Sequence, residues 1–313
     1  MHSPSPEAGV PGYIQVPLYF LTAPGLVLFF MVSGALLLPV RGDTFGFLRH
    51  RIAKIIAPLL FWSAFYIAER QFLNPDVKMM FHEVASLPFM FTGAPVMWFL
   101  YTLLGLYLLA PIVSPYLMRT GQKEIRFYLL LWGVTLLYPW LKMIVEVDGG
   151  TQASLYYFTG YAGYFIFGYY LHTYNHRVPI SILVLCIVLP TTCMLLYKGL
   201  GGEGFYPHLG YLGILVAVMA FAWYHAIRRF SPKNESRLLS TLSNCSFGVY
   251  LVHIFIMRSV LWRSDFIIHG MGPIGQVVAT WLCTLVISFI ITWAVSFVPY
   301  SEYIIGFSSR KRK

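Results

Sequence analysis

Charged side chains are scarce in this chain of 313 residues, since Asp, Glu, Lys and Arg together make up 11% of it. Soluble proteins carry about a quarter. Hydrophobic residues reach 58% and aromatic residues 18%, and no long polar stretch leaves room for a sizeable soluble domain. We therefore predict an all-α, polytopic integral membrane helix bundle that forms a single domain over residues 1–313.

Cysteines are few, and their spacing excludes two kinds of site. None of the four forms a CxxC pair or a Cys/His pattern with the spacing of metal ligands, so we predict neither a disulfide framework nor a metal site. All four lie in apolar segments, at Cys186, Cys193, Cys245 and Cys283. We interpret them as buried thiols.

The net charge of +10 indicates membrane topology rather than a nucleic-acid partner. A nucleic-acid binder gathers Lys and Arg on one exposed face, whereas here they form short clusters between apolar runs. Those runs predict about nine membrane spans, at residues 18–40, 52–69, 96–117, 127–145, 155–174, 179–197, 208–227, 244–262 and 276–299.

The basic clusters alternate with acidic linkers along the chain, and cytoplasmic loops are the basic ones. This pattern predicts that the basic tail, residues 307–313, is cytoplasmic and that residues 1–17 lie outside. Residues 1–17 lack the charged and apolar regions of a signal peptide. We therefore expect them to be the outer-side remnant that follows a missing first helix.

Ionisable groups at membrane depth are candidates for function. His253 lies in the eighth predicted span, where it could bind substrate or simply satisfy a neighbouring helix. Arg49, Arg51 and Lys54 open the second span, and Arg51 and Lys54 share one helical face. They could hold a phosphate-rich cytosolic ligand, although plain anchoring at the cytoplasmic surface explains them as well.

Small and aromatic residues supply the remaining candidates for the substrate site. Ser33 and Gly34 form a small patch on a bulky span, which favours close helix packing over a substrate path. Trp98, Tyr101 and Tyr164 could stack on a sugar ring. Aromatic residues at the membrane interface are, however, more often anchors.

Together, five segments in order over residues 25–260 resemble the acyltransferase-3 family, and among its members the stand-alone branch related to enterobacterial common antigen O-acetyltransferase. The segments read VLFFMVSGALLL, FLRHRIAKIIAPLLFW, VMWFLYTLLGLYLLAPI, FTGYAGYFIFGYYL and CSFGVYLVHIFI. The resemblance implies a ten-helix enzyme of the bacterial inner membrane. Such an enzyme moves an acyl group, usually acetyl, from cytosolic acyl-CoA to a hydroxyl of a cell-surface or lipid-linked glycan.

The resemblance also implies roles for particular residues. His2 matches the histidine that is the leading candidate for the catalytic base, whereas that histidine's basic partner on the first helix has no counterpart here. Arg51 matches the first arginine of the family's second basic motif, and Lys54 replaces the second. Together with Arg49, they are expected to bind the phosphates of acetyl-CoA or another acyl-CoA. The acyl group is expected to pass directly from the donor to the acceptor, without a metal ion.

Expected partners are membrane lipids, the glycan acceptor and, for a secreted polysaccharide, its assembly proteins. No nucleic acid is expected. Two alternatives from other classes stay open: a flippase or transporter of a lipid-linked glycan, and an inactive scaffold subunit of a polysaccharide secretion complex. Binding of CoA would separate the enzyme from the transporter.

Overall fold

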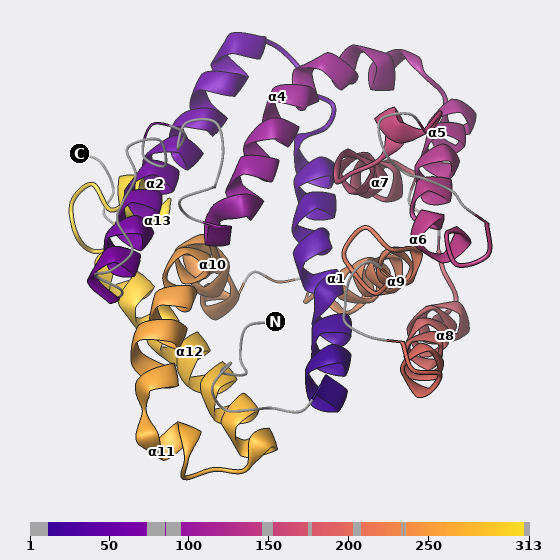
Figure 1. The fold of residues 1–313 in the computed structure, drawn as a ribbon. Coiled ribbons are helices and arrows are strands. Elements are labelled where there is room, and N and C mark those ends of the chain that lie inside the picture. The colour runs from indigo at the N-terminus through magenta and orange to yellow at the C-terminus, as the bar shows by residue number, and fades with distance from the viewer. Residues whose placement is uncertain are drawn as a thin grey trace. The chain divides into compact units, whose positions relative to one another are not determined.

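The computed structural model describes residues 12–73, 85, 95–145, 153–174, 177–202, 208–232, 234 and 236–309. Within these ranges every regular element is a helix (Figure 1). Apolar spans favour helices because a helix satisfies its own backbone hydrogen bonds where no water is available. The prediction of an all-α fold is confirmed.

Six helices in the described part of the chain are long and apolar enough to cross a membrane, which confirms a polytopic membrane protein. The π-helix η3 (Ile256–Val260) and the short η4 (Leu261–Arg263) extend the fifth of them. The six are α1 (Gly12–Leu37), α2 (Thr44–Leu73), α4 (Trp98–Arg119), α8 (Ile180–Gly199), α10 (Arg237–Phe255) and α12 (Pro273–Val295).

The other three predicted spans contain shorter helices, which corrects their predicted bounds. These are α5 (Gln122–Thr135), α7 (Ala162–Thr173) and α9 (Ile214–Phe230), with 14, 12 and 17 residues. The run 127–145 is divided before α6 (Tyr138–Leu141), where Pro139 suits the first turn of a new helix. The run 155–174 is divided at Gly160, whose φ of 95° ends η2 (Tyr156–Phe158) before α7 begins.

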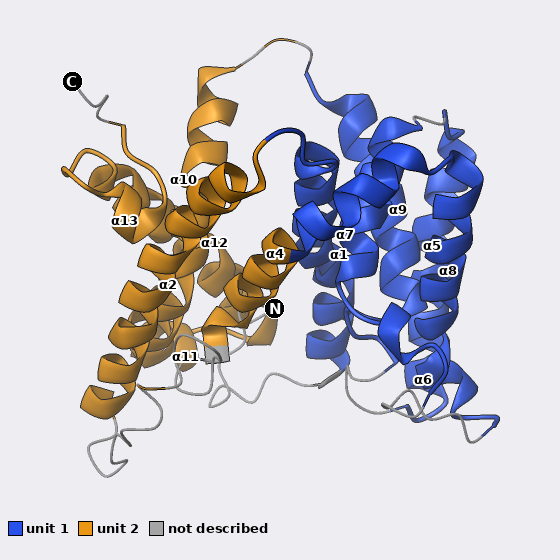
Figure 2. Ribbon diagram, turned by 90° about the horizontal axis from the view of Figure 1, so that it is seen from above, with its two compact units in different colours: residues 1, 11–42, 109–232 blue, residues 2–10, 43–108, 233–313 orange. Residues whose placement is uncertain are grey.

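The chain forms two compact units, coloured separately in Figure 2. The first unit contains residues 11–42 and 109–232, and the second unit contains residues 43–108 and 233–313. Helix α4 contributes its second half to the first unit and its first half to the second. The second unit also contains the short elements η1 (Pro95–Met97), α11 (Asp265–Ile268) and α13 (Glu302–Ile305).

The core of the first unit is the close crossing of α1 and α7. A Cβ atom added at Gly34 would collide with the Phe165 carbonyl, and one added at Gly168 would collide with the Met31 carbonyl. Glycine therefore allows the two backbones to approach, as small residues do between membrane helices. The predicted packing role of the Ser33–Gly34 patch is confirmed for Gly34.

The second unit is held together by contacts between helices that are distant in the sequence. The Trp62 indole nitrogen donates to the Ile304 carbonyl at 2.8 Å, which fixes α13 against α2. Gly248 of α10 lies against Thr292 of α12 and Ile305 of α13, where a larger residue would not fit. Helix α13 thus contacts both α2 and α10, and the candidate site lies on these two helices.

Candidate active site

The cationic end of α2 is set by the residue that precedes the helix. The Asp43 carboxylate accepts hydrogen bonds from the backbone nitrogens of Phe45 and Gly46 at 3.1 and 2.6 Å. Such capping satisfies amide groups that lack partners within the helix, so α2 begins at Thr44. The first three turns then carry Arg49, Arg51 and Lys54.

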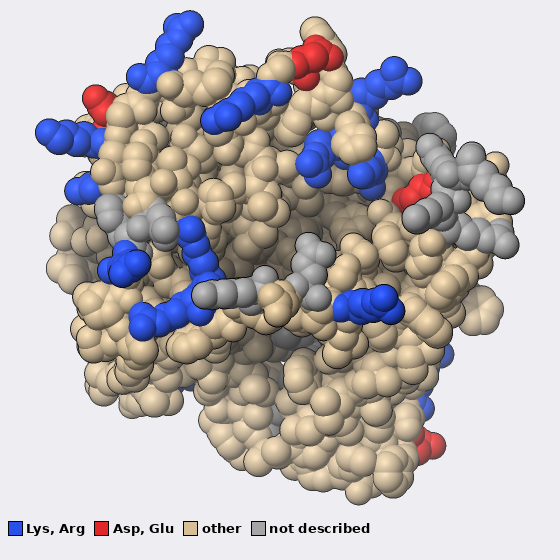
Figure 3. Space-filling model, turned by 180° about the vertical axis from the view of Figure 1, so that it is seen from behind, with Lys and Arg blue, Asp and Glu red and all other residues tan. Residues whose placement is uncertain are grey.

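These three cations are open to a ligand. Arg49 and Lys54 are exposed and Arg51 is half-buried. Within the described residues, no hydrogen bond or ion pair involves their side chains. Figure 3 shows Lys and Arg at the surface of the face it displays, where Asp and Glu are fewer. An unengaged pair of cations on one helical face can bind phosphate oxygens.

The opposite end of α2 carries two buried polar residues, Tyr66 and Glu69, at 4% and 8% exposure. They are three residues apart and so lie on one face of the helix. A buried carboxyl group in an apolar helix is costly unless it has partners. The partners of Tyr66 come from the end of α10, and the partner of Glu69 comes from the π-helix η3 that follows it.

Tyr66 inserts its hydroxyl group into the backbone of α10. The hydroxyl donates to the Leu251 carbonyl at 2.7 Å and accepts from the Phe255 backbone nitrogen at 3.3 Å. These two backbone groups would bond to each other in a regular α-helix. Immediately afterwards α10 changes into the π-helix Ile256–Val260. A side chain inserted into the ladder is a known cause of such irregularity, and π-helical turns are frequent at functional sites.

The π-helix brings two polar side chains to the buried end of α2. The Ser259 hydroxyl donates to Oε1 of Glu69. Oε2 of Glu69 is buried and has no hydrogen-bond partner among the residues that the structure describes. Arg258 and Glu69 both lie close enough to the Tyr66 hydroxyl to act on it electrostatically. The arrangement fixes one carboxyl oxygen and leaves the other without a hydrogen-bond partner among the described residues.

His253 lies on α10 one turn before the π-helix. Its Nδ1 donates to the Tyr250 carbonyl oxygen, so the proton is on Nδ1 in this arrangement. The Tyr250 hydroxyl in turn donates to the Val96 carbonyl at 3.0 Å. The ring centroids of Tyr250 and Phe99 are 5.3 Å apart. These contacts join α10 to the segment that carries Trp98 and Tyr101.

The predicted site residues are divided between the two units. Tyr101 lies beside Ser63 of α2. In the first unit Tyr164 is fully buried, and its hydroxyl donates to the Tyr211 carbonyl at 2.7 Å. Ser33 is half-buried on α1, and His2 lies outside the described residues. The second unit contains Arg49, Arg51, Lys54, Trp98, Tyr101 and His253.

Sequence reasoning missed Tyr66, Glu69, Arg258 and Ser259. A signal for Glu69 was present, because it is the one acidic residue in the predicted span 52–69. Ser259 gave none, because its contact with Glu69 spans 190 positions and depends on the π-helix. Among the described residues no three His, Cys, Asp or Glu side chains converge as a metal site would require, and the four cysteines are free thiols.

Comparison with known proteins gives a family match. The family model described as an acyltransferase domain, of the acyltransferase-3 type, matches residues 2–296, which is most of the chain. No curated protein and no solved structure matches it.

Proposed function

Since this chain belongs to the acyltransferase-3 family, we propose that it moves an acetyl group from acetyl-CoA to a hydroxyl of a cell-surface or lipid-linked glycan. The match over residues 2–296 is the observation that carries the proposal. The same argument applies to other acyl groups, since every acyl-CoA donor is a thioester. We place the enzyme in the bacterial inner membrane with its C-terminus in the cytoplasm.

The donor's phosphates are assigned to the cationic end of α2. Arg51 offers a planar guanidinium that can contact two phosphate oxygens at once, and Lys54 offers a point charge. Arg49, exposed two residues before Arg51, adds a third cation. Their lack of partners within the described residues supports this assignment, because a bound phosphate would not have to displace an existing ion pair.

The acceptor hydroxyl is assigned to the other end of the same helix. Arg51 and Glu69 are 18 residues apart, a separation of about 27 Å along a regular helix. The phosphates and the reacting hydroxyl are thus bound at opposite ends of α2, and the donor's pantetheine arm runs between them. Oε2 of Glu69 accepts a hydrogen bond from the acceptor hydroxyl, while Ser259 holds Oε1.

The reaction is a direct transfer. The hydroxyl oxygen attacks the thioester carbonyl carbon, so a C–O bond forms as the C–S bond breaks. The hydroxyl proton passes to a base and then to the sulfur of the departing CoA. By family resemblance that base is His2, and Glu69 orients the hydroxyl. Trp98 and Tyr101 offer ring faces to the sugar, with His253 as a further hydrogen-bonding group. For Tyr164 and Ser33, which belong to the first unit, substrate binding stays a prediction from the sequence.

Transfer in sealed membrane vesicles tests this function. Vesicles containing the chain receive acetyl-CoA labelled in the acetyl group, and label on the glycan is measured. We expect the double variant Arg51→Ala/Lys54→Ala to raise the KM for acetyl-CoA by about 10- to 100-fold, because charge-assisted hydrogen bonds are lost. Lys142→Ala, which removes an exposed cation elsewhere, is the matched control.

Two results would count against the proposal. Absence of label on any glycan, in membranes that contain native acceptors, would favour the transporter or the scaffold. An unchanged KM in the double variant would remove the cationic end of α2 from the donor site while leaving the activity itself in place.

A further inference from the structure

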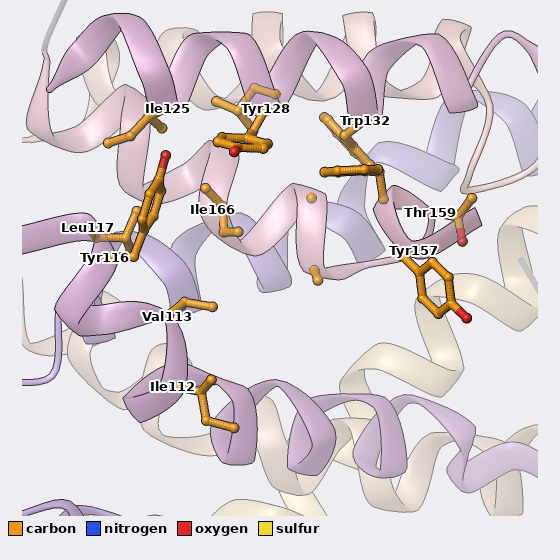
Figure 4. A pocket seen from close by; sticks show the side chains of 14 residues that line it. Ile112, Val113, Tyr116, Leu117, Ile125, Tyr128, Trp132, Tyr157, Thr159 and Ile166 are labelled. Atoms are coloured by element: carbon orange, nitrogen blue, oxygen red, sulfur yellow. The ribbon is translucent and has the colours of Figure 1, made fainter. Parts of the chain in front are cut away.

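The first unit contains a cavity that the proposed reaction does not use. Its volume is about 400 Å³, within the usual range for sites that hold small molecules. The second half of α4, the helices α5 and α7, and η2 form its walls (Figure 4). The side chains that line it are mostly aliphatic and aromatic.

The walls of this cavity are fixed by contacts of their own. The Trp132 indole nitrogen donates to the Gly160 carbonyl at 3.1 Å. Gly163 leaves room for the indole ring, because a Cβ atom there would collide with it. The Tyr128 ring is stacked on Phe158 with centroids 6.0 Å apart. The cavity is therefore present before any ligand binds.

The lining favours a hydrocarbon chain over a sugar or a nucleotide. Its side-chain polar groups are the hydroxyls of Tyr116, Tyr128, Tyr157 and Thr159 and the indole nitrogen of Trp132. The Thr159 hydroxyl already donates to the Tyr156 carbonyl at 2.7 Å, and the Trp132 nitrogen is bound to Gly160. A sugar buried here would leave most of its hydroxyl groups without partners. A hydrocarbon chain has no such requirement.

One end of the cavity lies at the junction of α4 and α5. Figure 4 shows Tyr116, Leu117 and Ile125 together at this end, with Tyr157 and Thr159 at the other. Tyr116 and Leu117 belong to the last turn of α4, and Ile125 belongs to the first turn of α5. Arg119 follows Tyr116 by three residues and therefore lies on the same face of α4, and Lys123 lies in the first turn of α5, two residues before Ile125.

That junction is strongly basic. Arg119 and Lys123 are exposed, and neither makes a hydrogen bond or ion pair with the described residues. Glu124 is the one acidic residue between positions 116 and 126, so with Arg126 the net charge is positive. Arg126 donates from Nε to the Tyr170 hydroxyl at 3.1 Å, which ties the start of α5 to α7.

We propose that the first unit binds an anionic phospholipid at this place. One acyl chain occupies the cavity, and the phosphate lies at Arg119 and Lys123. A cavity with apolar walls, next to two cations that have no partner among the described residues, matches a molecule with a long apolar chain and an anionic head. Cations at a bilayer surface attract anionic lipid headgroups. The proposal does not depend on the chain being an acyltransferase.

Lipid binding to the purified full-length chain tests the site. Native mass spectrometry would give the affinity for phosphatidylglycerol and for phosphatidylcholine with the same acyl chains. We expect phosphatidylglycerol to bind more tightly. Arg119→Ala/Lys123→Ala should weaken it by about 25-fold, taking about fivefold for each cation. Lys142→Ala, at an exposed cation of the same unit, should have no effect.

A second pair of variants tests the cavity itself. Ala162→Phe fills part of it and should weaken both lipids alike, whereas Leu130→Phe changes an exposed residue of α5 outside the lining and should weaken neither. If Ala162→Phe fails to fold, the phosphatidylglycerol affinity of Arg119→Ala/Lys123→Ala is the deciding measurement. Equal affinities for the two lipids, an undiminished affinity in the cation variant, or tighter binding of a polyprenyl phosphate than of phosphatidylglycerol would each overturn the proposal.

Discussion

The two units build different interiors from apolar helices. In the first unit the helices α1 and α7 approach through glycines, and the cavity between α4, α5 and α7 is lined by apolar side chains. In the second unit a carboxyl group is buried between α2 and the π-helix. A membrane protein has to offset the cost of such a group. The comparison indicates that catalytic residues should be sought in the second unit, and that the first unit is built mainly by close helix packing.

The largest effect should come from the buried carboxyl group of the second unit. Glu69→Gln keeps the shape of the side chain but removes the carboxylate that we propose orients the acceptor hydroxyl. We expect kcat to fall by about 100-fold, as misplacement of a reacting group does, with little change in acetyl-CoA binding. Glu69→Asp should recover part of the rate.

Glu124→Gln is the control for this variant, because Glu124 is exposed on α5 of the first unit. A kcat in Glu69→Gln that equals the wild-type value would show that the second unit's buried carboxyl group is structural. The contrast between the two units would then be one of packing alone.

The next effect concerns the glycine crossing of the first unit. Gly34→Ala should destabilise the chain by about 1–3 kcal/mol, because an added methyl group has to push α1 away from α7. Gly25 lies on the same helix, and a Cβ atom added there would meet no other atom within 4 Å, so Gly25→Ala should be neutral or slightly stabilising. Thermal unfolding in detergent measures both, and equal stabilities would contradict the packing described for the first unit.

The smallest effect should follow from loss of the inserted hydroxyl in the second unit. Tyr66→Phe leaves the Leu251 carbonyl and the Phe255 amide without their shared partner and should destabilise the chain by about 1 kcal/mol. Tyr300→Phe, at an exposed tyrosine of the same unit, is the control. Slowed hydrogen exchange at Phe255 in Tyr66→Phe would mean that α10 closes into a regular helix, contrary to this expectation.

The helical architecture could be predicted well from the sequence, because apolar runs report directly on helices in a membrane. Each of the nine predicted spans contains a helix, and the cations predicted for the second span lie in the first turns of α2. The predicted bounds of the spans were wrong where a proline or a glycine divides an apolar run into two helices. Pro139 lies in the first turn of α6, and Gly160 separates η2 from α7.

The polar centre of the second unit could not be predicted in the same way. Its geometry depends on Tyr66 reaching into α10, 185 positions further along the chain. The π-helix that presents Ser259 to Glu69 follows from the meeting of two distant helices. Periodicity and composition are local properties of a sequence, so they locate Glu69 in its span without indicating its partner.

The most direct test of the central claim is the release of CoA thiol by the purified chain, measured with acetyl-CoA in the presence and absence of an acceptor glycan. The account predicts that thiol appears when the glycan is present, in equal amount to the acetyl groups gained by the glycan. Release that does not depend on the glycan, or no release with glycans from the native membrane, would contradict the assignment of this chain as an acetyl-CoA-dependent glycan acyltransferase.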